Sequence, residues 1–209
     1  MGEEMGLFID KVISSVIETI LFALLPFIWW LATVKGEIPF TQWTGIKKVE
    51  KGNRAGTVKM TVCTAIPFLL LSIFLFYLLK GTQTATAEFR GMGVKALPAV
   101  FVYAFFNTAF PEEILFRGFL LKRLKNKLGF WSANIIQSVL FGALHGGMFF
   151  FLVGTGTVKT VTVTVFTGAS AWVMGYINEE KADGSILPGW IMHGIANIVS
   201  AVVSMFSVV

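Results

Sequence analysis

Residues 99–118 read AVFVYAFFNTAFPEEILFRG, an apolar run that is interrupted by two adjacent acids and an arginine. A charged side chain inside a hydrocarbon segment costs roughly 2.5–3.5 kcal/mol on insertion scales. Glu113 and Arg117 are four residues apart, so they share a helix face and can pair, whereas Glu112 points about 100° away. Glu112 is therefore a spare carboxylate in apolar surroundings, and such groups are candidate bases.

The composition around this run is that of a polytopic membrane protein. The 209-residue chain is 55% hydrophobic and 14% charged, and it contains 21 Phe. This balance excludes an ordinary soluble domain. The net charge of +5 does not indicate a nucleic-acid partner, because the basic residues cluster in short loops between apolar spans.

Counting apolar stretches of about 20 residues predicts an all-α fold with about six transmembrane helices. The spans are expected near residues 12–34, 60–79, 97–116, 130–153, 158–177 and 186–207. The sequence contains no internal repeat, and no connection is long enough to hold a second domain.

The distribution of Lys and Arg predicts the orientation. The loops 35–59, 117–129 and 178–185 share one side and carry twelve basic residues, whereas the other side carries five. The richer side is expected to be cytoplasmic, which places both termini outside. Segment 35–59 is interpreted as an ordinary cytoplasmic loop on the lipid headgroups, in preference to a substrate-binding element.

The chain contains only two histidines, and both fall inside predicted spans. His145 lies in FGALHGG, and His193 lies in HGIAN together with Asn197, four residues later on the same helix face. Counted from the shared basic side, Glu112, His145 and His193 lie about 15, 24 and 10 Å along their helices. We expect them to share a layer nearer the cytoplasmic face, in a buried polar cavity that admits water.

Glycines flank both histidines. Gly142, Gly146 and Gly147 surround His145, and Gly194 follows His193. Small residues are common where transmembrane helices pack closely, so this pattern predicts tight helix contacts around the polar layer.

These polar residues support the hydrolysis of an amide. Glu112 and His145 can polarise a water for attack, and His193 and Asn197 can donate hydrogen bonds to the developing oxyanion. Glu113 and Arg117 then hold the helix register and orient Glu112. Two histidines and a glutamate are also a zinc ligand set, so a metal site at Glu112, His145 and His193 stays open as the alternative.

Three motifs occur in the order of a known family. EEILFR resembles the EExxxR signature, FGALH the FxxxH motif and HGIAN the HxxxN motif of the CPBP intramembrane proteases, which include CAAX proteases and the bacteriocin-processing Abi proteins. The resemblance covers about residues 97–202. It divides the chain into N-terminal transmembrane helices with a basic cytoplasmic loop at 1–96 and a protease core at 97–209.

The resemblance implies an intramembrane endopeptidase of the CAAX prenyl endopeptidase type. It assigns water activation to Glu112 and His145 and oxyanion stabilisation to His193 and Asn197, with an orienting part for Glu113 and Arg117. No cofactor is expected, with zinc as the alternative. The expected partners are a membrane-embedded or lipidated peptide substrate and the bilayer, and the expected location is a prokaryotic plasma membrane with the active site opening towards the cytoplasm. Bacterial relatives are also linked to bacteriocin self-immunity.

Two other function classes remain open. Intramembrane acids and histidines also occur in proton-coupled transporters, although transporters commonly have internal repeats. A non-catalytic membrane scaffold or immunity protein accounts for the Glu113–Arg117 pair. It accounts poorly for four further polar groups at depth.

Overall fold

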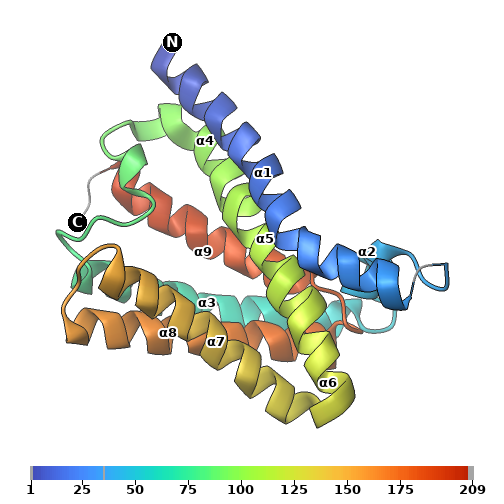
Figure 1. The fold of residues 1–209 in the computed structure, drawn as a ribbon. Helices are drawn as coiled ribbons and strands as arrows, with labels where there is room; N and C mark the ends of the chain where they lie inside the picture. The colour runs from blue at the N-terminus through green and yellow to red at the C-terminus, as the bar shows by residue number, and fades with distance from the viewer. Residues whose placement is uncertain (1, 35, 207–209) are drawn as a thin grey trace.

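The structure is a computed structural model, and it describes residues 2–34 and 36–206. Its long helices are α1 (Gly2–Thr33), α3 (Arg54–Leu78), α7 (Phe130–Phe151), α8 (Thr157–Tyr176) and α9 (Leu187–Met205), and α2 (Phe40–Thr44) is a short helix after α1 (Figure 1). Between α3 and α7 runs one long helix, of which α4 (Leu97–Val102), α5 (Phe110–Glu113) and α6 (Lys122–Leu128) are parts. The described residues contain helices and no strands, which confirms the predicted all-α class.

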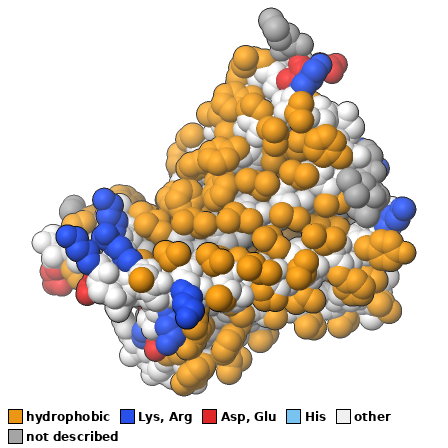
Figure 2. Space-filling view, turned by 180° about the vertical axis from the view of Figure 1, so that it is seen from behind, with side chains coloured by type: hydrophobic (Ala, Val, Ile, Leu, Met, Phe, Trp, Pro, Cys, Tyr) orange, Lys and Arg blue, Asp and Glu red, His pale blue; other side chains and the backbone are white. Residues whose placement is uncertain are grey.

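Six of the described helices are long and apolar enough to cross a membrane, as the sequence predicted. Apolar side chains cover most of the face seen in Figure 2, and charged side chains gather towards its margins. The first helix begins at Gly2 rather than near residue 12, and the third ends at Leu128 rather than near 116. Both extensions carry charged residues. A helix can continue beyond the hydrocarbon layer, and basic residues at its C-terminus complement its dipole.

The helix that carries Glu112 departs from regular α geometry on both sides of this residue. Tyr103–Ala109 and Ile114–Leu121 are π-helical, and the four-residue α5 lies between them. Pro111 has no N–H to donate within the helix, so regular α hydrogen bonding cannot run through this turn. Single π turns inside α-helices often mark functional sites.

Close packing around the histidines confirms the prediction from three of the four glycines. A Cβ at Gly142 would lie 2.5 Å from the Thr164 carbonyl oxygen, and one at Gly194 would lie 2.3 Å from the Phe105 ring. Gly146 packs on Thr164 in the same way. Gly147 has no neighbour within 4 Å of the corresponding position, so for Gly147 the prediction is wrong.

The three basic loops predicted to share one side meet at one end of the molecule. Asp183, after α8, accepts hydrogen bonds from the Glu50 backbone at 3.0 Å and from the Asn53 amide at 2.6 Å. Lys122 of α6 pairs with Glu179 at 2.5 Å. The predicted grouping of these loops is therefore confirmed, and the compartment they face stays a prediction.

Candidate active site

Three separate helices bring the predicted polar residues together. Glu112 and Glu113 lie on α5, His145 on α7 and His193 on α9. Glu112 Oε2 lies 4.0 Å from His145 Nε2 and 3.8 Å from His193 Nε2. Together with Arg117 we call these residues the acid–histidine cluster. The shared layer expected from helix lengths is therefore present.

The Glu113–Arg117 pair anchors this cluster. The two side chains are fully buried, and Arg117 Nη1 lies 3.0 Å from Glu113 Oε1. The guanidinium carbon stacks 4.5 Å from the centre of the Phe141 ring, which adds a cation–π contact. Because a buried charge without a partner is very costly, each member of this pair stabilises the other.

His193 lies between the two glutamates. Its Nδ1 is 3.3 Å from Glu113 Oε1, and its Nε2 faces Glu112. Since an ionised carboxylate only accepts hydrogen bonds, Nδ1 donates to Glu113, and the other ring nitrogen, Nε2, is left to face Glu112. The sequence predicted that Glu113 orients Glu112, whereas the structure shows Glu113 in contact with His193.

His145 is oriented by its own helix. Its Nδ1 lies 3.0 Å from the Phe141 carbonyl oxygen, one turn earlier, and its ring lies 4.3 Å from the Phe141 ring. A carbonyl oxygen only accepts, so Nδ1 carries the hydrogen and the neutral ring presents the Nε2 lone pair towards Glu112. In this tautomer His145 can accept a proton at Nε2.

Glu112 is the reactive group that this geometry singles out. Among the described residues, its buried Oε2 has no hydrogen-bond partner. Its side chain is nevertheless 19% exposed and that of His145 23%, so neither side chain is fully enclosed. Atoms 4.0 Å apart are too distant for a direct hydrogen bond, and they are close enough for one water to contact both.

Asn197 lies one turn beyond His193 and is engaged with a neighbouring helix. Its amide nitrogen donates to Thr108 Oγ1 at 2.7 Å and to the Ala104 carbonyl oxygen at 3.3 Å. These bonds use both amide hydrogens. Its predicted role as an oxyanion donor requires at least one of them to be exchanged for the substrate, and that role stays a prediction.

Sequence reasoning missed two polar residues beside the cluster. Asn178 is fully buried and donates to Glu113 Oε2 at 3.5 Å. Glu18 of α1 is half-buried and interacts electrostatically with Glu112. Glu18 carried a usable signal, because it is an acid inside a predicted span. Asn178 carried none, since its environment depends on α9.

The residues present do not form a metal site as they stand. In the part of the chain that the structure describes, no three His, Cys, Asp or Glu side chains are placed to hold a metal ion. Ligand atoms on a tetrahedral zinc lie about 3.3 Å apart, given bonds of about 2.0–2.1 Å. Glu112 Oε2 lies farther than this from both imidazoles.

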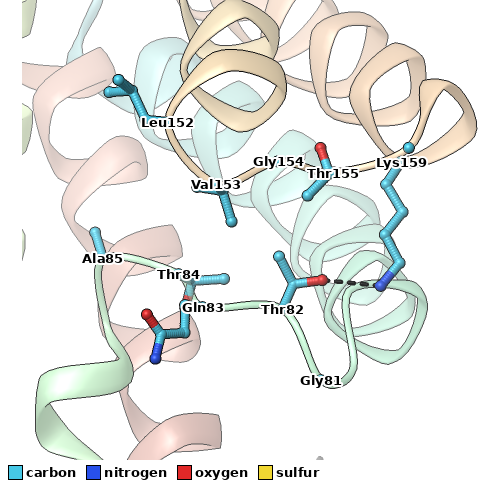
Figure 3. A pocket seen from close by; sticks show the side chains of 11 residues that line it. Gly81, Thr82, Gln83, Thr84, Ala85, Leu152, Val153, Gly154, Thr155 and Lys159 are labelled. Atoms are coloured by element: carbon cyan, nitrogen blue, oxygen red, sulfur yellow. Dashed lines mark hydrogen bonds between the residues drawn. The ribbon is translucent and has the colours of Figure 1, made fainter.

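A polar hollow elsewhere in the molecule is separate from this cluster. It has a volume of about 670 Å³ and lies between the loops 81–85 and 152–156, where Lys159 donates to Thr82 (Figure 3). The residues that line it include none of the predicted site residues. The acid–histidine cluster is therefore the candidate active site.

Comparison with known proteins shows the family to which the chain belongs. A family model described as "Type II CAAX prenyl endopeptidase Rce1-like" matches residues 94–199, about half of the chain. Searches of curated proteins and of solved structures give no match. The matched segment contains Glu112, His145 and His193 and all three sequence motifs. The chain belongs to the Rce1-like family of type II CAAX prenyl endopeptidases, which are intramembrane proteases.

Proposed function

We propose that this protein hydrolyses peptide bonds of membrane-embedded or lipidated substrates, using a water activated by Glu112 and His145. One observation carries the proposal. A carboxylate oxygen without a hydrogen-bond partner among the described residues faces the Nε2 atoms of two histidines from two other helices. Packing alone gives no reason to bring these three groups together.

The reaction follows from the directions in which these side chains donate and accept hydrogen bonds. A water between Glu112 Oε2 and His145 Nε2 gives up a proton to this pair as its oxygen attacks the carbonyl carbon. Imidazolium His193, stabilised by Glu113, donates from Nε2 to the oxyanion, and Asn197 adds a second donor. Collapse of the tetrahedral intermediate breaks the C–N bond, and the proton held by the pair passes to the leaving amine.

No metal is required in this mechanism, because Glu112 and His145 supply the base and His193 supplies a hydrogen-bond donor to the oxyanion. The spacing of Glu112 from the two histidines is the support for this choice. If a zinc ion were bound, Glu112, His145 and His193 would hold it, and its chemistry would be to acidify the water.

The substrate class follows from the location of the site and from the family. Glu112 lies inside a helix long enough to span the bilayer, so a substrate must reach it from the lipid or the interface. A C-terminal segment that carries a prenyl group meets this requirement, as does a membrane-inserted peptide.

The test is cleavage of a peptide panel by purified, detergent-solubilised protein. The panel contains a farnesylated peptide with a C-terminal CaaX sequence, its unmodified counterpart and a membrane-inserted peptide. Wild type and Glu112→Gln are compared, each with and without a strong zinc chelator. Cleavage that is lost in the variant and insensitive to chelator supports the proposal. Cleavage lost to chelator assigns a metal site, and cleavage retained by Glu112→Gln overturns the mechanism.

A further inference from the structure

Asn178 lies outside the three motifs and nevertheless contacts the acid–histidine cluster. It belongs to the π-helical segment Ile177–Lys181 that continues α8, and its side chain is fully buried. Its amide nitrogen lies 3.5 Å from Glu113 Oε2, and its amide oxygen accepts from the Gly189 backbone N–H at 2.9 Å. One side chain therefore connects the end of α8 to Glu113 and to the first turn of α9.

The first turn of α9 is shaped to receive this contact. A Cβ at Gly189 would lie 2.5 Å from Asn178 Nδ2 and 2.8 Å from Glu113 Oε2. Real Cβ atoms do not approach other atoms so closely, so a larger residue at 189 would displace one of these groups. Gly189 is thus required by the approach of two polar side chains to the helix start.

Glu113 is held from three directions as a result. Arg117 and His193 contact Oε1 at 3.0 and 3.3 Å, and Asn178 approaches Oε2. A carboxylate restrained at only one oxygen can rotate about its terminal torsion, which is a broad and soft one. The contact at the second oxygen limits that rotation, and with it the position of the oxygen that orients His193.

We infer that Asn178 is a positioning residue that acts through Glu113 to aim His193 Nε2 at the reacting carbonyl. This inference rests on the proposed function. The chain of contacts runs from Asn178 to Glu113, then to His193, whose Nε2 lies 3.8 Å from Glu112. Because a displacement of about 1 Å at a catalytic group can cost about 10²-fold in rate, loss of this restraint has a measurable effect.

The chain offers a matched control for this inference. Asn134 of α7 is also fully buried, and its amide donates across a helix interface to the Trp172 carbonyl oxygen at 2.9 Å. It lies outside the acid–histidine cluster. Asn178→Leu and Asn134→Leu therefore remove equally buried amides, and only the first removes a contact with Glu113.

Steady-state cleavage by the full-length, detergent-solubilised protein is the first readout. Asn178→Leu is expected to lower kcat about 10–10²-fold with KM nearly unchanged. Asn134→Leu is expected to leave kcat within about twofold of wild type. Gly189→Ala retains the Asn178 side chain but moves it away from Glu113, and it is expected to behave like Asn178→Leu. Should Asn178→Leu fail to fold, Gly189→Ala carries the test.

The second readout needs no activity. The protein contains two histidines, so ¹⁵N-labelled histidine gives two sets of ring signals, which His145→Gln assigns. At fixed pH, Asn178→Leu or Gly189→Ala is expected to shift the His193 signals and leave those of His145 in place. Asn134→Leu is expected to move neither set.

The two readouts separate the two proposals. If wild type cleaves no peptide while the His193 signals shift as expected, the proposed function fails and the positioning contact stands. If wild type cleaves, and Asn178→Leu and Gly189→Ala leave both kcat and the His193 signals unchanged, the positioning inference is wrong. A loss of activity matched by Asn134→Leu also overturns it, since that result assigns the effect to packing.

Discussion

Two of the buried polar clusters among the described residues differ in what their polar atoms face. The first, the α7–α8 amide cluster, consists of Asn134, Gln137 and Ser138. Gln137 Nε2 lies 2.7 to 3.1 Å from Asn134 Oδ1, Ser138 Oγ and the Ala171 carbonyl oxygen, three acceptors that share its two amide hydrogens. Gln137 Oε1 has no hydrogen-bond partner among the described residues. All of its groups are neutral, and they join two helices that pack closely. The second is the acid–histidine cluster.

The acid–histidine cluster is built differently. It contains charged and titratable groups from three helices, and the atoms at its centre stand 3.8 to 4.0 Å apart. Its outer members are hydrogen-bonded or paired, which fixes the orientation of the inner ones. The comparison teaches that a buried polar group does not by itself indicate a site. The distinguishing feature is a carboxylate oxygen without a hydrogen-bond partner among the described residues that faces the ring nitrogens of two histidines from two other helices.

Among the variants that test this difference between the clusters, Glu112→Gln is expected to have the largest effect on cleavage. The amide keeps the size of the side chain and removes the base, so cleavage should fall by about 10²–10⁴-fold. The variant should unfold at the same temperature as wild type or higher, because a buried carboxylate oxygen with no hydrogen-bond partner among the described residues is replaced by a neutral group. Peptide cleavage and thermal unfolding measure the two properties. Retained cleavage would make the acid–histidine cluster no different in kind from the amide cluster.

Arg117→Met tests the ion pair that supports the cluster. Removing Arg117 leaves Glu113 with only its contacts to His193 and Asn178, and breaking a buried pair costs about 3–5 kcal/mol of stability. Chemical unfolding in detergent measures this loss. The double variant Arg117→Met with Glu113→Gln is expected to recover part of the stability without recovering activity. A single variant as stable as wild type would show that another group neutralises Glu113.

Asn197→Ala sharpens the assignment of the oxyanion donors. Loss of one such donor typically lowers kcat by about 10²–10³-fold. The matched variant Thr108→Val removes the partner to which Asn197 donates at 2.7 Å and keeps the amide. If Asn197 acts on the oxyanion, Thr108→Val should stay close to wild type in kcat. Equal losses in both variants would assign Asn197 to helix packing instead.

Asn134→Ala in the α7–α8 amide cluster should have the smallest effect. It removes a helix-to-helix hydrogen bond and leaves Gln137 with one acceptor fewer, at a cost of about 1–3 kcal/mol of stability. Its kcat should match that of wild type at a temperature where both are folded. A selective loss of kcat would show that the amide cluster is coupled to the active site.

Much of the site could be predicted because charge is costly at membrane depth. That rule identified Glu112, Glu113, Arg117 and the two histidines from position alone. Applied to residues 12–34, the same rule would also have found Glu18, which interacts with Glu112. The rule cannot identify amides such as Asn178. A neutral amide costs less in a span than a charge does, and it has no motif of its own.

The sequence by itself determined the six apolar helices, the sharing of one end by the basic loops and the pairing of Glu113 with Arg117. These features depend on hydrophobic length, on loop charge and on the four-residue spacing within one helix, and all three are local. Only the tertiary structure decided that Glu113 contacts His193, that Asn178 contacts Glu113 and that Asn197 bonds to Thr108. Each of these contacts joins residues more than sixty positions apart, so it depends on how helices rotate and pack, which no local pattern records.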